Sequence, residues 1–70
     1  MASIEAPMAG KIVEINVKIG DTIAEDDEVI ILEAMKMENV IYAPEGGIVK
    51  EIKVKEGQMI NEGDVLIVFE

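Results

Sequence analysis

At 70 residues the chain has room for one small domain, which would keep a large share of its surface exposed and have little stability to spare. Half of the residues are apolar, so a packed core is possible without disulfides. Six Lys against 15 acidic residues give a formal net charge of −9, and the chain contains no Arg. Because binding to a phosphate backbone requires clustered Lys or Arg, we expect no nucleic acid as a partner.

The missing residue types limit the chemistry further. The chain has no His and no Cys, which excludes a Ser–His or Cys–His nucleophile pair and a His- or Cys-based zinc site. We therefore expect no catalytic residue and no metal site. No apolar run reaches 18 residues, and the N-terminal residues lack signal-peptide and transit-peptide features, so we expect no direct membrane insertion. A cysteine-free chain fits a reducing compartment, and we expect the cytoplasm.

The first half of the chain has the pattern of short strands separated by turns. Apolar and polar residues alternate over residues 13–18, as in a strand with one buried face. Gly20 and Asp21 then mark a turn, since Gly tolerates the positive φ that many turns need. The acidic stretch at residues 25–28 lacks the spacing of an EF-hand loop, which favours a solvated loop over a metal site. The apolar run at residues 29–32 is typical of a strand buried on both faces.

The second half repeats the first. A shift of 37 positions lays residues 6–33 over residues 43–70 without a gap, and 13 of the 28 pairs are identical. The shared Pro, Gly and Asp positions favour a duplication over chance, although a one-residue slip fits the last apolar runs equally well. Duplicated short strands predict an all-β sandwich or flattened barrel, with halves related by an approximate two-fold axis.

The segment between the two halves has no counterpart in the repeat. Residues 32–38 are all strong helix formers, yet they lie between β-branched groups, and a helix there would be apolar nearly all round. We therefore predict a tight reversal that exposes Lys36 between Met35 and Met37. Local rules that fail at one place often mark function. From composition alone, an ordinary exposed Lys beside two Met that fill the core is an open alternative.

The central sequence Glu-Ala-Met-Lys-Met-Glu, residues 33–38, closely resembles the attachment motif of biotinyl carrier domains. Residues 6–10 are similar to the opening of that family, and residues 46–49, 56–57 and 63–65 to its second half. The resemblance covers essentially all 70 residues, which form one carrier domain with halves at about 6–33 and 43–70. Residues 12–21 leave no room for a protruding thumb, so the chain resembles the thumb-less type.

The resemblance implies the fold and the chemistry. The family fold is a flattened barrel of two four-stranded antiparallel sheets related by a pseudo-two-fold. Lys36 would carry covalent, amide-linked biotin, with Ala34, Met35 and Met37 as flanking recognition residues. The implied function is a non-catalytic biotin carboxyl carrier that shuttles CO2 between carboxylase or decarboxylase sites and carboxyltransferase sites. The implied partners are a biotin protein ligase and the biotin carboxylase, decarboxylase and carboxyltransferase subunits of such a complex.

Two alternatives belong to other classes. Lipoyl domains share the fold but usually carry Asp-Lys-Ala around the modified lysine, where this chain has Met35 and Met37. A lipoyl carrier for acyl transfer is therefore the second interpretation, and an unmodified interaction module is the third. The ligase that modifies Lys36 separates the first two, and an intact function after Lys36→Arg would indicate the third.

Overall fold

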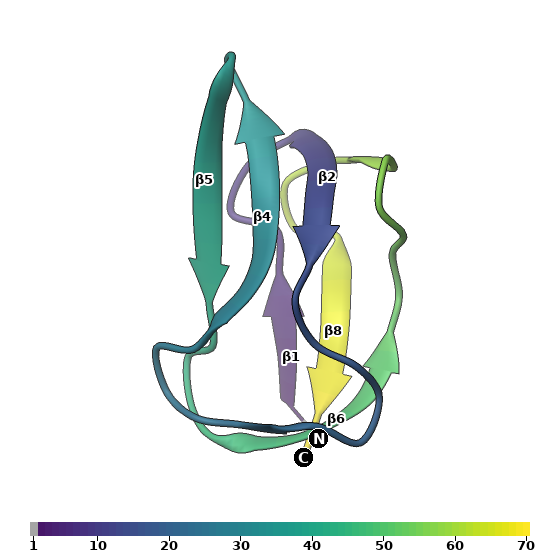
Figure 1. The fold of residues 1–70 in the computed structure, drawn as a ribbon. Helices are drawn as coiled ribbons and strands as arrows, with labels where there is room; N and C mark the ends of the chain where they lie inside the picture. The colour runs from purple at the N-terminus through teal and green to yellow at the C-terminus, as the bar shows by residue number, and fades with distance from the viewer. Residues whose placement is uncertain (1) are drawn as a thin grey trace.

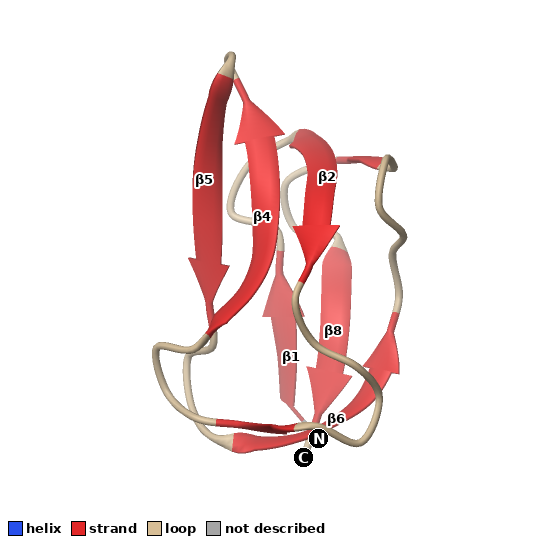
Figure 2. Ribbon diagram, in the orientation of Figure 1, coloured by secondary structure: helices blue, strands red, loops and turns tan. Residues whose placement is uncertain are grey.

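The computed structural model describes residues 2–70 as an arrangement of strands, turns and loops without a helix (Figures 1 and 2). The eight strands in chain order are β1 (Ala2–Glu5), β2 (Gly10–Ile15), β3 (Thr22–Ile23), β4 (Glu28–Ala34), β5 (Met37–Tyr42), β6 (Gly47–Ile52), β7 (Met59–Ile60) and β8 (Val65–Phe69).

The strands form two antiparallel four-stranded sheets, with the orders β1-β8-β6-β3 and β5-β4-β2-β7. The two orders match strand by strand: β1 corresponds to β5, β8 to β4, β6 to β2 and β3 to β7. Strands β2 and β6 differ by 37 residues at both ends, as do β3 and β7. The predicted all-β flattened barrel with pseudo-two-fold symmetry is confirmed.

The two halves are interleaved rather than placed side by side. Strand β3 pairs with β6 of the other half, and β7 pairs with β2. The backbone N–H of Gly20 donates to the carbonyl of Val49 at 2.8 Å, and the equivalent N–H of Gly57 donates to Ile12 at 2.7 Å. Each half therefore completes the sheet that the other half begins.

Four turns share one hydrogen-bonding device. In each turn, one residue forms two hydrogen bonds with the residue three positions earlier. Its side-chain oxygen accepts from the backbone N–H of the earlier residue, and its backbone N–H donates to the carbonyl of that residue. The acceptors are Asp21, Asp27, Gln58 and Asp64, at 2.8–3.0 Å. The acidic stretch at residues 25–28 thus contains a turn closed by Asp27. Within it, Asp26 has φ 72°, where its counterpart is Gly63 with φ 88°.

The core lies between the two sheets and repeats with the same offset. The eight largest fully buried side chains are four equivalent pairs, Ile12/Val49, Val29/Leu66, Ile30/Ile67 and Leu32/Phe69. This pairing resolves the register in the last apolar runs, because a one-residue slip would place exposed residues opposite buried ones. The runs are not buried throughout: Ile31 is half-buried, and Val65 is 38% exposed.

The alternation predicted for residues 13–18 is present from Ile15 to Lys18, but it was wrong at Val13, and the strand is shorter than predicted. Strand β2 ends at Ile15, and its pairing with β4 shifts register between Ile12 and Glu14. The extra residue of this β-bulge is Val13, which is 38% exposed, whereas Ile12 is fully buried. Side chains along a regular strand alternate between the two faces of the sheet. The extra residue at the bulge interrupts this alternation, so Ile12 points into the core and Val13 does not.

We predict that Gly47→Ala strongly destabilises the fold. An added Cβ would lie 2.7 Å from the carbonyl oxygen of Glu70 and 2.7 Å from a ring carbon of Phe69, so the backbone would have to move. Overpacking of this kind costs about 2 kcal/mol. In a domain of this size that lowers the Tm by about 10 °C, measurable by thermal unfolding. The matched control is Gly46→Ala, whose Cβ would approach the Ile23 carbonyl only to 3.3 Å. Equal Tm values for the two variants would contradict the close approach.

Candidate attachment site

The site is the tip of the hairpin formed by β4 and β5. Ala34 pairs with Met37 at the end of the ladder, which leaves Met35 and Lys36 as a two-residue turn. Both turn residues have positive φ, 55° for Met35 and 63° for Lys36, as the type I′ turn requires. The tight reversal predicted from the sequence is therefore present. Its geometry follows from the right-handed twist of the two strands, which type I′ turns match.

The residues in this turn are unusual for its backbone conformation. Type I′ turns prefer Asn-Gly, and a left-handed conformation costs an ordinary L-residue about 1 kcal/mol. Met35 and Lys36 both adopt it, and the nearest polar support is an Asn39 side-chain N–H that donates to the Met37 carbonyl at 3.2 Å. The long pairing of β4 with β5 holds the strained turn in place. Such retained strain is a feature of functional segments.

The tip holds its central side chains out in solvent. Met35 is 93% exposed and Met37 is 66% exposed, and Lys36 is exposed between them, whereas Ala34 is nearly buried at the top of β4. Within residues 2–70, the two ion pairs join Lys50 to Glu70 and Lys53 to Glu51, so neither holds the Lys36 amine. An acyl group on this amine would displace no packed side chain. The residues present therefore fit a covalently attached cofactor.

The tip is also the place where the internal symmetry ends. Glu33 and Glu70 are equivalent, but the turn that follows Glu33 has no counterpart within residues 43–70. The pseudo-two-fold thus relates the hairpin tip to the two chain ends. Figure 1 shows the tip at the top of the molecule and both ends at the bottom.

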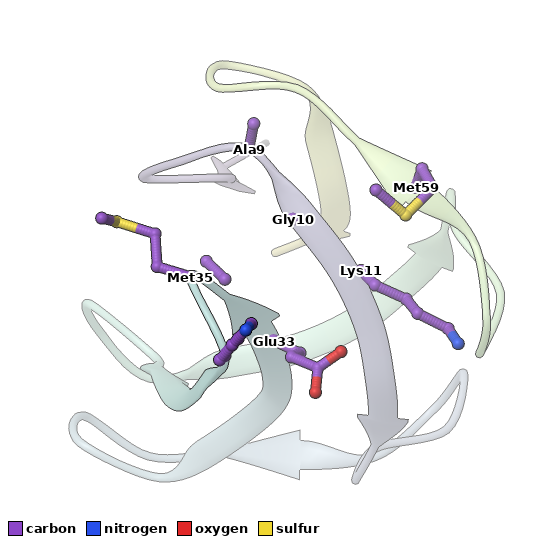
Figure 3. A pocket seen from close by; sticks show the side chains of 8 residues that line it. Ala9, Gly10, Lys11, Glu33, Met35 and Met59 are labelled. Carbon is purple, nitrogen blue, oxygen red and sulfur yellow. The ribbon is translucent and has the colours of Figure 1, made fainter.

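The structure adds neighbours that the sequence pattern did not single out. Beside the tip lies a depression of about 420 Å³, shared by Lys36 with residues from β2 and β7 (Figure 3). Met59 of β7 reaches it because β7 pairs with β2, where Lys11 is opposite Met59. Met59 lies 23 residues along the chain from Lys36, and nothing in its local sequence marks it.

Comparison with known proteins identifies the class that this fold and site define. The family model Biotin_lipoyl, described as "Biotin-requiring enzyme", matches residues 2–69, and the chain belongs to this family. The biotin carboxyl carrier protein of Streptococcus mutans is 51% identical over 41 residues, covering 59% of this chain and 32% of that protein. The glutaconyl-CoA decarboxylase subunit gamma of Acidaminococcus fermentans is 54% identical over 39 residues, covering 56% and 27% respectively. The matched segment thus spans about a third or less of these relatives.

Solved structures agree on the fold. The urea carboxylase of Kluyveromyces lactis matches 99% of this chain with a TM-score of 0.91 and 33% identity, over 6% of that longer chain. The lipoyl domain of the 2-oxoglutarate dehydrogenase complex of Azotobacter vinelandii matches the whole chain and 96% of its own length, with a TM-score of 0.83 and 22% identity. The second likeness shows the shared fold alone. The described residues include no helix suited to spanning a membrane.

We predict that Met35→Asn stabilises the domain, because Asn adopts the left-handed conformation at lower cost than Met. The expected gain is about 0.5–1 kcal/mol, seen as a Tm higher by a few degrees. Met37→Asn is the control: Met37 is also exposed, but it lies in β5, where Asn is disfavoured, so no gain is expected. A Tm for Met35→Asn below that of the unaltered chain would contradict the strained turn.

Proposed function

We propose that the chain is a biotin carboxyl carrier domain, with Lys36 as the attachment residue and residues 1–70 as a single domain. The observation that carries the proposal is the exposed Lys36 at the strained tip of the hairpin, in a chain whose family model describes a biotin-requiring enzyme. The carrier protein and the decarboxylase subunit among its relatives support the same assignment.

The attachment step is an acylation of Lys36. The nucleophile is the neutral amine, and the amide nitrogen that forms is neutral too. The ligase must therefore remove a proton from Nζ. The nitrogen then forms a bond to the carbonyl carbon of activated biotin, the bond to the activating group breaks, and an amide results. This chain supplies the amine and its presentation, and a biotin protein ligase supplies the chemistry.

After attachment, the role of this chain is to position the carried group. Biotin, when bound, supplies a ureido nitrogen that takes up and releases a carboxyl group. The interleaved sheets hold the base of the hairpin, while Lys36 holds the group on a flexible side chain beyond it. A tether of this kind makes delivery effectively intramolecular. The distance between the tip and the chain ends lets the tip enter a partner's site while the ends face away (Figure 1).

The partners follow from this role as proposals. They are a biotin protein ligase, a biotin carboxylase or decarboxylase, and a carboxyltransferase, between which the carrier moves CO2. The relatives named as a carrier protein and as a decarboxylase subunit support this set. The domain itself is proposed to be non-catalytic. A cytoplasmic location stays a prediction.

We predict that ligase treatment with biotin and ATP adds one biotinyl group to the domain, measured by intact mass and streptavidin binding. Lys36→Arg keeps the charge of the tip and removes the acylable amine, so its mass should not change. Lys36 is one of six lysines, so loss of the whole gain in this single variant assigns the site. A gain only with a lipoyl ligase and lipoate would replace the proposal by an acyl carrier. No gain with either enzyme would favour an unmodified interaction module.

We also predict that the Met35→Leu/Met37→Leu double variant is biotinylated more slowly. The exposed thioethers at the tip are polarisable and adaptable, which suits recognition by several partners, and Leu lacks these properties. A loss of about tenfold in kcat/KM for the ligase is expected, equivalent to about 1.4 kcal/mol of recognition. Met8→Leu, at an exposed Met outside the turn, is the control. Normal biotinylation of the double variant would show that Ala34 and the backbone of the turn suffice.

A further inference from the structure

The depression beside the tip is lined by residues from three separate segments. They are Ala9, Gly10 and Lys11 at the start of β2, Glu33 to Lys36 at the end of β4 and in the turn, and Met59 of β7. Figure 3 looks onto it, with Met59 and Lys11 to one side of Gly10 and with Met35 and Glu33 to the other. Its volume of about 420 Å³ lies within the range of small-molecule sites, about 300–1,000 Å³.

Gly10 lies beside the depression, at a point where β2 passes close to the backbone of β4. An added Cβ at this position would collide with the carbonyl oxygen of Glu33, so β2 and β4 approach closely here. Met59 of β7 is opposite Lys11 of β2, which is in turn opposite Glu33 of β4, so these three residues form one row across the sheet. The counterpart of Met59 in the other half is Thr22, so the methionine side chain is a feature of the Lys36 side alone.

The lining combines apolar contact with one donor and one acceptor. Met59, 70% exposed, and Ala9 offer apolar surface. Lys11 and Glu33 are directly opposite each other on β2 and β4, and neither belongs to the ion pairs found within residues 2–70. Their ammonium and carboxylate groups are thus available to a ligand with both hydrogen-bond acceptors and donors. A ureido group has one carbonyl acceptor and two N–H donors, and the sulfur-containing ring fused to it is apolar.

We propose that this depression is a resting site for the biotinyl group carried by Lys36. In it, Met59 and Ala9 contact the apolar ring, Lys11 donates to the ureido carbonyl, and Glu33 accepts from a ureido N–H. The assignment rests on the proposed function for the identity of the group. It adds a binding role for Met59 and Lys11, which lie outside the attachment motif, and for Glu33 at its first position.

The tether makes such a site effective even when its intrinsic affinity is low. Lys36 is itself part of the rim, so the attached ring is held close to the depression. A short flexible tether gives an effective concentration in the millimolar range, so an intrinsic Kd of about 1 mM would leave the group docked for about half of the time. The open site releases the group readily to a partner, while docking shields the apolar ring from water between transfers.

The test compares unmodified and biotinylated domains by ¹H–¹⁵N NMR, after intact mass has established that Lys36 carries biotin. Docking is expected to shift the amides of Gly10, Lys11 and Met59 and to give nuclear Overhauser contacts between the biotin ring protons and the Met59 methyl group. In Met59→Ser these contacts disappear and the shifts at residues 9–11 fall by at least half. Ile19→Ser is the control, since Ile19 is 67% exposed, comparable to Met59, and does not line the depression.

A second measurement separates this inference from the proposed function. Unmodified domain is titrated with biotinamide up to about ten times the expected 1 mM Kd, which needs no modification of Lys36. Saturable shifts at residues 9–11, 33 and 59 support the site whether or not a ligase modifies the chain. Shifts confined to residues 34–38 in the biotinylated domain, with no saturable shift in the titration, would overturn the resting site while leaving the carrier function intact.

Discussion

The backbone pairing between the two halves of the chain is the constraint on which the rest of the structure depends. Strand β3 adds to the sheet begun by β6, and β7 adds to the sheet begun by β2. The loops that lead to these short strands donate to the opposite half, through Gly20 and Gly57. Neither half can satisfy its edge strands alone. A chain of this size thereby joins two four-stranded sheets around one core.

The same symmetry explains why the candidate attachment site protrudes. Strands β4 and β8 are equivalent in the repeat, and β4 continues through the turn at Met35 and Lys36 into a hairpin with β5. The regular pairing of β4 with β5, from Ile30 opposite Ile41 to Ala34 opposite Met37, supports the turn. Two residues with left-handed backbone are held there despite their cost. Rigidity of the hairpin and freedom of the Lys36 side chain thus come from different parts of the structure. A carrier needs both, because the group must be presented at a fixed place and still reach another protein's site.

The surroundings of the tip differ from those of the chain ends, although the scaffold is nearly symmetric. Gly10 and Gly47 are equivalent, and both allow a close approach to a carbonyl, of Glu33 and Glu70 respectively. Only the Gly10 end combines that approach with Met59 and with an extended hairpin. The two duplicated halves have thus diverged at the positions that surround Lys36. Elsewhere the two halves are still alike. The four turns closed by a side-chain hydrogen bond and the four pairs of core residues lie at equivalent positions.

The elements that depend on local pattern could be predicted from the residues alone. The 37-residue repeat, the β class, the turns at Gly20 and Gly57, and the unmatched segment around Lys36 all follow from residue type and spacing. Local alternation failed at Val13, because a bulge is set by the pairing of β2 with β4 rather than by the strand's own residues. The tertiary structure alone decided which half each short strand joins and that Met59 lies beside the tip. These are contacts between residues far apart in the chain, and a period of two along one strand carries no information about the strand that pairs with it.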